Sequence, residues 1–255
     1  MKHRDGRLVS VSLLQPVADL LAQPPMAYYQ TDLRGPDGGD TASLYLTEMA
    51  SGGNLKPTMT GGPIVFQYAA RNCTIELPSG RQMLAAVEGP VVARASMVLP
   101  MEPMTWDEMQ TEVSTIVRMF DDAGWVRSGR PVQSPLRPED FSDDSGPKSA
   151  TVGAWRECEA GPARAVVTVQ HYNSLTGSSF TPPAVLSEKL PENAPDLFLI
   201  YVTFSPATQE ISDSLSELVT ARRASEGLDP AYQKLPASVW LDDPDWRPRG
   251  WSGGF

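Results

Sequence analysis

A helix near the middle of this chain is specified at its start, along its buried face and at its end. Thr105 and Glu108 form a T-x-x-E capping box, the signature of a helix N-terminus. Gly124 stands where a helix needs a left-handed residue after its last turn, and Trp125 can fold back on Phe120. Between these ends, apolar residues recur with the period of one helix face: Trp106, Met109, Val113, Ile116, Val117 and Phe120. The sequence therefore predicts an amphipathic helix that needs another layer to cover its apolar face.

β-rich runs and turn residues on both sides of this helix predict the layer on which it lies. Before it, we expect a hairpin and a strand, formed by residues 73–77, 82–87 and 91–99. After it, we expect a second hairpin and a strand, formed by residues 151–158, 163–172 and 197–204. Another helix should open at Ser205-Pro206, with Ser as the cap and Pro in the first turn, and end at Gly227.

This order of elements predicts an α+β fold, with a mainly antiparallel sheet and two principal amphipathic helices packed on one face. We expect a single domain over residues 1–255, in which residues 1–63 form a loop-rich N-terminal region. The repeated order of hairpin, strand and helix raises the hypothesis of a duplication, with halves 64–126 and 150–227. Residues 236–255 form a tail rich in Trp and Asp that cannot be a regular helix, and its tryptophans either pack back on the domain or mark a contact site.

The charge of the chain restricts the class of partner. There are 21 Lys and Arg against 31 Asp and Glu, which gives a net charge of −10 at pH 7. Such a surface repels phosphate backbones, and no dense basic run offsets it, so we do not expect a nucleic-acid partner. A negative field favours a cationic partner, although many ordinary globular proteins are also acidic.

Few residues suited to catalysis are present. The two histidines are His3 and His171, so any serine or cysteine triad would have to use His171, whose position beside Tyr172 at a strand end is more typical of a hydrogen-bonded structural histidine. Phosphate-loop, dinucleotide-binding, zinc-protease and EF-hand motifs are absent from the sequence, and we expect neither a cofactor nor a metal. The alternative is a small hydrolase or ligand-binding enzyme that uses His171 or a carboxylate pair.

Binding through acidic residues is the hypothesis that the sequence favours. Acidic residues cluster on the capped helix, in the polar connector that follows it and in the tail, and together they could present a negative, aromatic-flanked surface to a basic protein. The alternative is that they form three separate solvated faces. The candidate partner-binding residues are Asp107, Glu108, Glu112, Asp121, Asp122, Glu139, Asp140, Asp143, Asp144, Asp242, Asp243, Asp245 and Trp246.

The segment from Thr105 to Val126, with its Gly124-Trp125 end and the surrounding order of strands, resembles immunity proteins of bacterial secreted toxins, such as those of type VI secretion systems. The resemblance implies an α+β protein that binds one cognate effector and occludes its active site. It also implies that the protein is not an enzyme and carries no cofactor.

The two cysteines, Cys73 and Cys158, are too few for a disulfide scaffold or a Cys-based zinc site. We expect buried free thiols, with a single bridge as the alternative in an oxidising compartment. Polar residues interrupt the N-terminal apolar stretch of residues 8–22, and no run reaches the roughly eighteen apolar residues of a membrane span. These features predict a cytoplasmic protein, with the periplasm as the alternative.

Overall fold

The computed structural model describes residues 8–35, 38–47, 58–59, 63–129, 131–141, 148–175 and 195–253. As predicted, the fold is α+β and consists mainly of antiparallel sheet. In chain order the elements are β1 (Leu8–Val11), α1 (Val17–Leu21), η1 (Pro24–Met26), α2 (Tyr28–Arg34), β2 (Thr41–Thr47), β3 (Thr58–Met59), β4 (Val65–Tyr68), β5 (Ile75–Glu76), β6 (Gln82–Glu88), β7 (Val91–Met104), α3 (Trp106–Asp122), β8 (Val126–Arg127), η2 (Pro138–Asp140), β9 (Ser149–Arg156), η3 (Cys158–Ala160), β10 (Ala163–His171), α4 (Tyr172–Leu175), β11 (Phe198–Pro206), α5 (Gln209–Ser225) and α6 (Ala237–Asp242).

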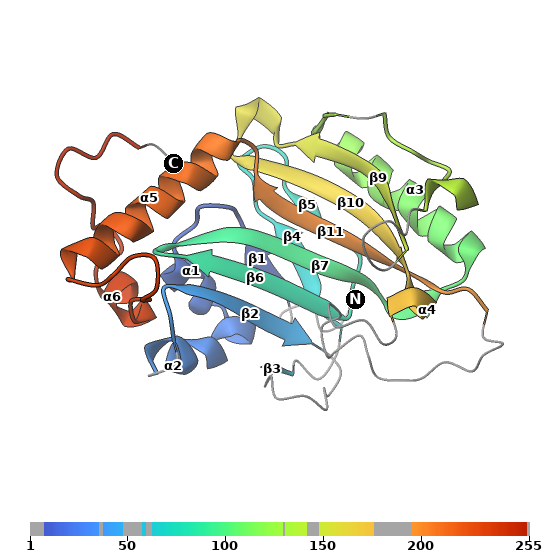
Figure 1. Ribbon diagram of the computed structural model, residues 1–255. Coiled ribbons are helices and arrows are strands. Elements are labelled where there is room, and N and C mark those ends of the chain that lie inside the picture. Colours follow the sequence, from blue (N-terminus) through green and yellow to red (C-terminus); the bar gives the residue numbers. More distant parts are fainter. Residues whose placement is uncertain are drawn as a thin grey trace.

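The large sheet has eight strands in the order β3-β2-β6-β7-β11-β10-β9-β8 (Figure 1). Its central strands, β7 and β11, pair antiparallel, and each leads directly into one of the two long helices. A smaller sheet has the order β1-β4-β5. The expected order of strand and helix therefore occurs twice, and the two copies meet at the centre of one sheet.

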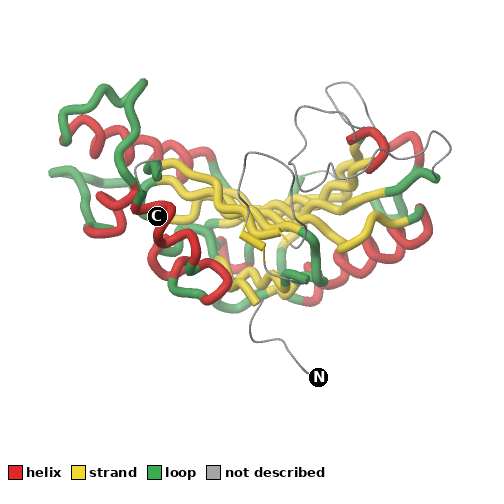
Figure 2. The backbone as a smooth tube through the Cα atoms, turned by 90° about the horizontal axis from the view of Figure 1, so that it is seen from below, coloured by secondary structure: helices red, strands yellow, loops and turns green. Residues whose placement is uncertain are grey.

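Alternation along the strands gives the large sheet one buried and one open face. Met83 and Ala85 of β6 are buried, whereas their neighbours Leu84 and Ala86 are partly exposed on the other side. Helix α3 and the small sheet cover the buried face, and the ring of Tyr68 on β4 stacks on that of Phe204 on β11 at 4.5 Å. The opposite side is called the open face below, although at one end of it Val98, Tyr172 and Leu199 form a small buried cluster. Figure 2, seen from below, shows α3 beneath the sheet and α5 at the other end of the molecule.

Helix α3 forms as its sequence predicts. The capping box is present, because the backbone N–H of Thr105 donates to Glu108 Oε2 at 2.9 Å. At the other end Gly124 has φ +82°. The Trp125 N–H donates to the Phe120 carbonyl at 3.0 Å, which is the 6→1 hydrogen bond of a Schellman motif. The rings of Phe120 and Trp125 pack edge to face at 5.4 Å. The expected apolar positions of the helix, apart from partly exposed Trp106, are buried in the main core.

Three expectations about the sheet and its helices are wrong. Residues 73–77 and 82–87 do not form a hairpin, because β5 pairs with β4 of the small sheet while β6 joins the large one. The second helix does not open at Ser205-Pro206: these residues extend β11, and α5 starts after Thr208. Nor do the long helices share a face, since α5 packs around the turn between β6 and β7, where a Cβ on Gly89 would lie 3.0 Å from Val219.

The tail contains a short helix, α6, which corrects the expectation that it has none. The expected packing of its tryptophans on the domain is confirmed by Trp240, which is 1% exposed. Trp246 and Trp251 pack against the same cluster as Trp240. Arg222 of α5 lies over the ring of Trp246, with its guanidinium carbon 4.7 Å from the ring centroid. Here the tail is part of the packing around α5.

The two cysteines form a disulfide, so the expectation of free thiols is wrong. Cys73 follows β4 and Cys158 opens η3, and their Cα atoms are 6.1 Å apart. The bridge joins the small sheet to the β9–β10 hairpin across a sequence separation of 85 residues. It therefore links segments that no local signal brings together.

Candidate functional site

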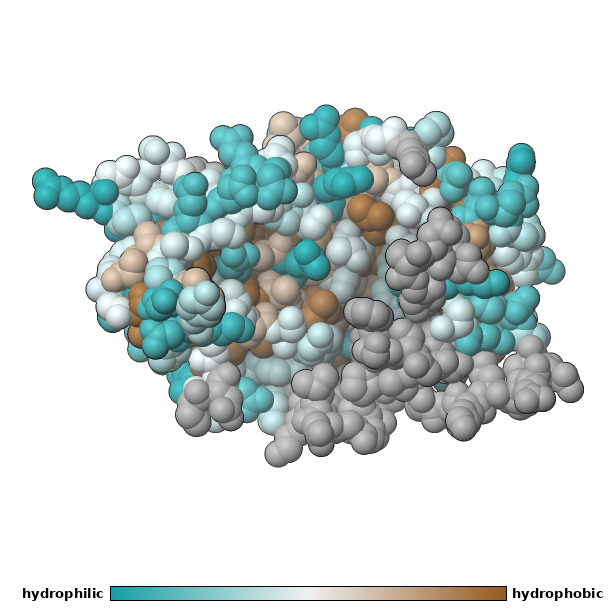
Figure 3. Space-filling view, in the orientation of Figure 1, coloured by the Kyte–Doolittle hydropathy of each residue, from teal (hydrophilic) through white to brown (hydrophobic). Residues whose placement is uncertain are grey.

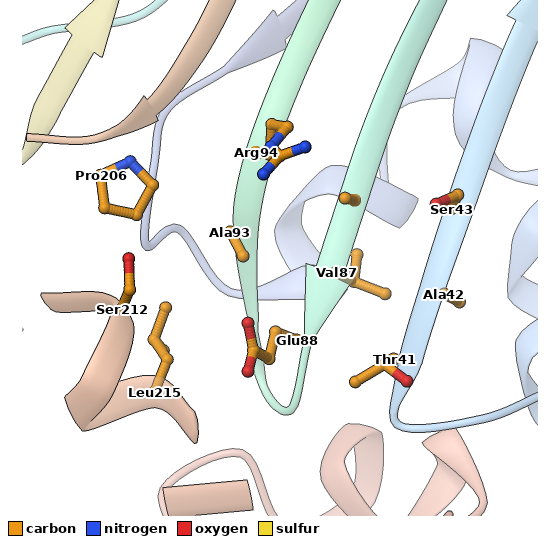
Figure 4. A pocket seen from close by; sticks show the side chains of 11 residues that line it. Thr41, Ala42, Ser43, Val87, Glu88, Ala93, Arg94, Pro206, Ser212 and Leu215 are labelled. Carbon is orange, nitrogen blue, oxygen red and sulfur yellow. The ribbon is translucent and has the colours of Figure 1, made fainter. Parts of the chain in front are cut away.

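A groove lies where α5 crosses the end of the open face, with a volume of about 540 Å³ (Figure 4). Strands β2, β6 and β7 form its floor, and the first turns of α5 form one wall. The residues that line it are Thr41, Ala42, Ser43, Ala86, Val87, Glu88, Ala93, Arg94, Pro206, Ser212 and Leu215. The groove is lined by hydroxyls, small apolar side chains and one pair of opposite charges.

An ion pair beside the groove fixes α5 to the sheet. The guanidinium of Arg223 donates to both carboxylate oxygens of Asp40 at 2.7 Å. Asp40 immediately precedes β2 and its side chain is fully buried, while that of Arg223 is 14% exposed. Because the pair is bidentate and shielded from water, it holds the helix at a defined distance from the strands that form the floor.

The two charged groups of the groove differ in their partners. Ser216 Oγ donates to Glu88 Oε1 at 3.1 Å, which holds the carboxylate against α5. Arg94 is exposed and forms no hydrogen bond or ion pair with any residue in the described part of the chain. The groove therefore offers a free guanidinium beside an occupied carboxylate.

A second cavity, of about 490 Å³, lies at the start of α3 and is called the Trp106 cavity. Its walls are mainly aromatic: the rings of Trp106 and Phe198 are 5.4 Å apart, and those of Phe141 and Phe198 are 5.6 Å apart. Its other lining residues are Pro138, Lys148, His171 and Asp196.

His171 lines the Trp106 cavity as a hydrogen-bonded histidine, as the sequence predicts. Its Nε2 lies 2.9 Å from Asp196 Oδ1, and its ring lies 5.5 Å from that of Phe198. Nδ1 is buried and has no partner among the described residues. The pair has the geometry in which an aspartate orients an imidazole, yet neither serine nor cysteine is among the described residues that line this cavity.

Many of the predicted partner-binding acids have internal partners. Asp121 accepts hydrogen bonds from Arg127 and, at 3.2 Å, from Trp155 Nε1, and the Arg127 contact lowers the pKa of Asp121 below its ordinary value. Glu108 caps α3, and its hydrogen bonds from Thr105 lower its pKa. The other internal contacts are Asp140 with the Arg137 backbone N–H, Glu139 with the Arg137 guanidinium at 3.9 Å, Asp242 with Arg34 and Asp243 with Arg222.

The remaining acids lie on α3, beside it or in the tail. Glu112 on α3 is partly buried, and this burial raises its pKa. Asp107 and Asp122 are exposed on α3, while Asp245 and the partly buried Trp246 lie after α6. Asp143 and Asp144 lie outside the described residues.

The structure brings some of these acids together and separates others. Gln110 of α3 donates to the Leu136 carbonyl at 2.8 Å, which places the η2 acids beside the N-terminal half of the helix. In contrast, α3 and α6 lie at opposite ends of the molecule in both Figure 1 and Figure 2. The α3 and tail acids therefore do not form one continuous surface, and the binding role of each group remains a prediction.

Sequence reasoning missed the groove. Its floor comes from strands whose outward residues look like ordinary solvated positions, and Arg94 carries no motif. Figure 3 shows polar and apolar side chains intermixed on this face of the molecule. The sequence of β6 gives no alternation that could have marked this side as open, because Met83, Leu84, Ala85 and Ala86 are all apolar.

Comparison with protein-family models, curated proteins and solved structures finds no match for this chain. Among the described residues, no helix is long and apolar enough to cross a membrane. The same part of the chain holds no group of three or more His, Cys, Asp or Glu side chains arranged to bind a metal.

Proposed function

We propose that this protein is a non-catalytic binding protein that engages a partner protein through the open face of its sheet and the adjoining groove. The observation that carries the proposal is the groove itself, a concave site of about 540 Å³ built jointly by three strands and α5. Ligand and partner sites favour concave surfaces with a few polar groups that fix orientation. The bidentate Asp40–Arg223 pair supports it further, because it preorganises the wall of the groove.

The chemistry of the groove supports binding over turnover. Among the described lining residues Glu88 is the single carboxylate, and it accepts a hydrogen bond from Ser216; two-carboxylate hydrolysis would need a second one. The described lining residues include no histidine or cysteine that could activate a nucleophile. What remains is a set of donors and acceptors suited to recognition.

The finer proposal is an immunity-type inhibitor that occludes a cognate bacterial toxin. The resemblance of Thr105–Val126 to immunity proteins supports it. The Cys73–Cys158 disulfide supports an oxidising compartment, and therefore the periplasm over the cytoplasm, because such bridges persist where thiols are not kept reduced.

The test is retention of a partner from a lysate of the source organism by the immobilised full-length protein and by two variants. Thr203→Trp places a bulky ring at the centre of the open face, where Thr203 pairs with Ser96 and Val166. Thr111→Trp places the same ring on the exposed, acidic side of α3. We expect one stoichiometric partner that Thr203→Trp loses and Thr111→Trp keeps. Loss by Thr111→Trp alone would assign the contact to the acidic surface of α3 and contradict the proposal.

A second candidate function, a ligand-binding enzyme that uses His171, is favoured by one observation. Asp196 holds the imidazole of His171 at the wall of an aromatic-lined cavity, and histidine is the side chain that most often serves as a general base. Its test is hydrolysis of p-nitrophenyl acetate by the full-length protein. Turnover above that of free imidazole, abolished in His171→Ala and reduced in Asp196→Asn, would favour the enzyme over the binding protein.

A further inference from the structure

Three exposed arginines lie in a row across the open face, and none has a partner among the described residues. Arg156 on β9 is directly opposite Arg164 on β10 in the antiparallel ladder. Arg164 is in turn opposite Ser205 on β11. Neighbouring strands are about 4.8 Å apart, so the first two guanidinium groups start from adjacent positions on the sheet.

Arg94 on β7 continues the same row. Phe204 of β11 is opposite Ala95, so Ser205 and Arg94 each lie one residue beyond this pair. Arg94 is then opposite Ala86 on β6, on the floor of the groove. The row formed by Arg156, Arg164 and Arg94 is called the arginine row below; it crosses three strand spacings, about 14 Å, and ends in the groove.

All three side chains point to the same, open side of the sheet. Their strand neighbours Trp155, Ala165 and Ala95 are completely buried on the other side. Because successive side chains in a strand alternate between faces, the arginines face away from the core. Residues directly opposite each other in an antiparallel pair share a face, so Arg156 and Arg164 are true neighbours.

In the isolated protein, the arginine row lowers the stability of the fold. Like charges directly opposite each other in a sheet repel and destabilise the pair. The chain has 31 acidic residues and a net charge of −10, yet no described acid pairs with any of the three arginines. In contrast, Arg34, Arg127, Arg222 and Arg223 each bind a carboxylate of this chain. A row of unpaired cations within an acidic protein is therefore suited to an anion that comes from outside.

We propose that the arginine row binds an acidic segment of the partner protein, with carboxylates of the segment paired to the guanidinium groups. This inference rests on the proposed function and names the chemistry of the partner. An extended segment with acidic residues at i, i+2 and i+4 presents three carboxylates on one side over about 14 Å, the length of the row. Guanidinium groups bind carboxylates in a bidentate manner, which gives orientation as well as attraction.

The test uses fluorescein-labelled hexaglutamate and the full-length protein, with fluorescence anisotropy at about 20 mM and 150 mM salt. We expect binding at low salt that weakens as salt rises, because the contact is between exposed charges. The double variant Arg156→Gln/Arg164→Gln should weaken hexaglutamate binding at least tenfold. Hexalysine of the same length should not bind at the row.

The matched control removes the same amount of charge elsewhere. Arg71 follows β4 and Arg118 lies on α3; both are exposed, and neither is on the open face. Arg71→Gln/Arg118→Gln therefore changes the net charge equally and should bind hexaglutamate as the unmodified protein does. Equal weakening in both double variants, or no binding by the unmodified protein, would overturn the proposal.

Two further measurements test whether the arginines are unpaired in the free protein and whether the row prefers carboxylate to phosphate. Without peptide, Arg164→Gln should raise the midpoint of thermal unfolding, because it removes the repulsion with Arg156. A lower midpoint would mean that Arg164 already has an internal partner, which contradicts an unoccupied row. Hexathymidylate that binds the row more tightly than hexaglutamate would assign the row to phosphate and overturn the acidic protein segment.

Failure of this inference can be told from failure of the proposed function. If Thr203→Trp loses the partner but Arg156→Gln/Arg164→Gln keeps it, the open face binds a protein and the arginine row does not receive it. If hexaglutamate binds at the row while no partner is retained at the open face, the anion site stands alone, and both the protein partner and the proposed function are contradicted.

Discussion

Glu157 is a partly buried carboxylate at the junction of the two sheets. Its Oε2 accepts hydrogen bonds from the Tyr68 hydroxyl at 3.0 Å and from the Ala163 backbone N–H at 3.1 Å. Burial outweighs these bonds and raises the pKa of the Glu157 carboxyl above its ordinary value of 4.5. The same burial, together with the nearby carboxylate, raises the pKa of Tyr68, so the hydroxyl stays protonated as the donor.

The raised pKa of Glu157 predicts a specific pH dependence of stability. Between its unfolded and folded pKa values the folded state holds the extra proton, so the contribution of Glu157 to the free energy of unfolding falls as the pH rises through that interval. Glu157→Gln keeps an acceptor for Tyr68 and removes the ionisation. We expect the variant to gain stability over the unmodified protein as the pH rises from 4 to 8, measured by urea unfolding. A difference that is constant with pH would show that Glu157 is not the titrating group.

For single residues, the sequence could predict side-chain contacts between neighbours in the chain. It could not predict contacts with a residue far away in the sequence. The capping box of Thr105 and Glu108 is predictable because its two residues lie three positions apart. The partner of Arg223 is Asp40, which is 183 residues away, so no local sequence pattern could identify the pair. Arg34 and its partner Asp242 are 208 residues apart, and no local pattern joins them either.

Among the elements, α5 depends on one buried ion pair for its position. Arg223→Met would leave the fully buried Asp40 carboxylate without its partner, and we expect a loss of about 3–5 kcal/mol in the free energy of unfolding. The double variant Arg223→Met/Asp40→Leu should recover part of this loss, because it removes the isolated buried charge. Urea unfolding of the two variants measures both values.

The matched control for this prediction is an exposed ion pair. Arg34 and Asp242 are 45% and 64% exposed and join α2 to α6. Because exposed pairs are screened by water and salt, Arg34→Met should cost no more than about 1 kcal/mol. A similar cost for Arg34→Met and Arg223→Met would contradict the role assigned to the buried pair.

The two long helices show which elements the sequence could predict. All signals for α3 lie within the helix and its ends, and each was confirmed except the burial of Trp106, which is partly exposed. The start of α5 was misplaced because Ser205 and Pro206 pair with Arg164 and Ala163 in the sheet, and this ladder overrides the local capping signal. The predicted pairing of residues 73–77 was wrong for the same reason. β5 pairs with β4 instead of β6, and long-range contacts rather than the local turn select this neighbour.

For the whole molecule, the Cys73–Cys158 disulfide is the main covalent constraint in the described chain. It closes a loop with a sequence separation of 85 residues, for which the chain-entropy model gives roughly 4–5 kcal/mol of stabilisation. We expect Cys73→Ser/Cys158→Ser to lower the free energy of unfolding by about 2–5 kcal/mol. A thiol assay of the unfolded, unreduced protein should find no free thiol; two free thiols per chain would contradict the bridge.

The sequence predicted the α+β class and favoured the binding hypothesis, but it could not locate the surface proposed here for a partner. Net charge is a property of the whole chain, and it pointed to the acidic segments. The fold separates the α3 acids from the tail, and it aligns Arg94 and Arg164, which are 70 positions apart in the sequence, across one sheet face. The register of strand pairing therefore decides which charged side chains become neighbours, and this register cannot be deduced from composition.

Site-specific photo-crosslinking tests most directly that a partner protein is held on the open face. A benzophenone amino acid is placed at Thr203 on the open face, at Thr111 on α3, or at Tyr232, which is 88% exposed after α5. After irradiation in lysate, we expect a single protein adduct from the Thr203 variant and none from the other two. An adduct from Thr111 or Tyr232 in the absence of one from Thr203 would contradict the open face as the binding surface.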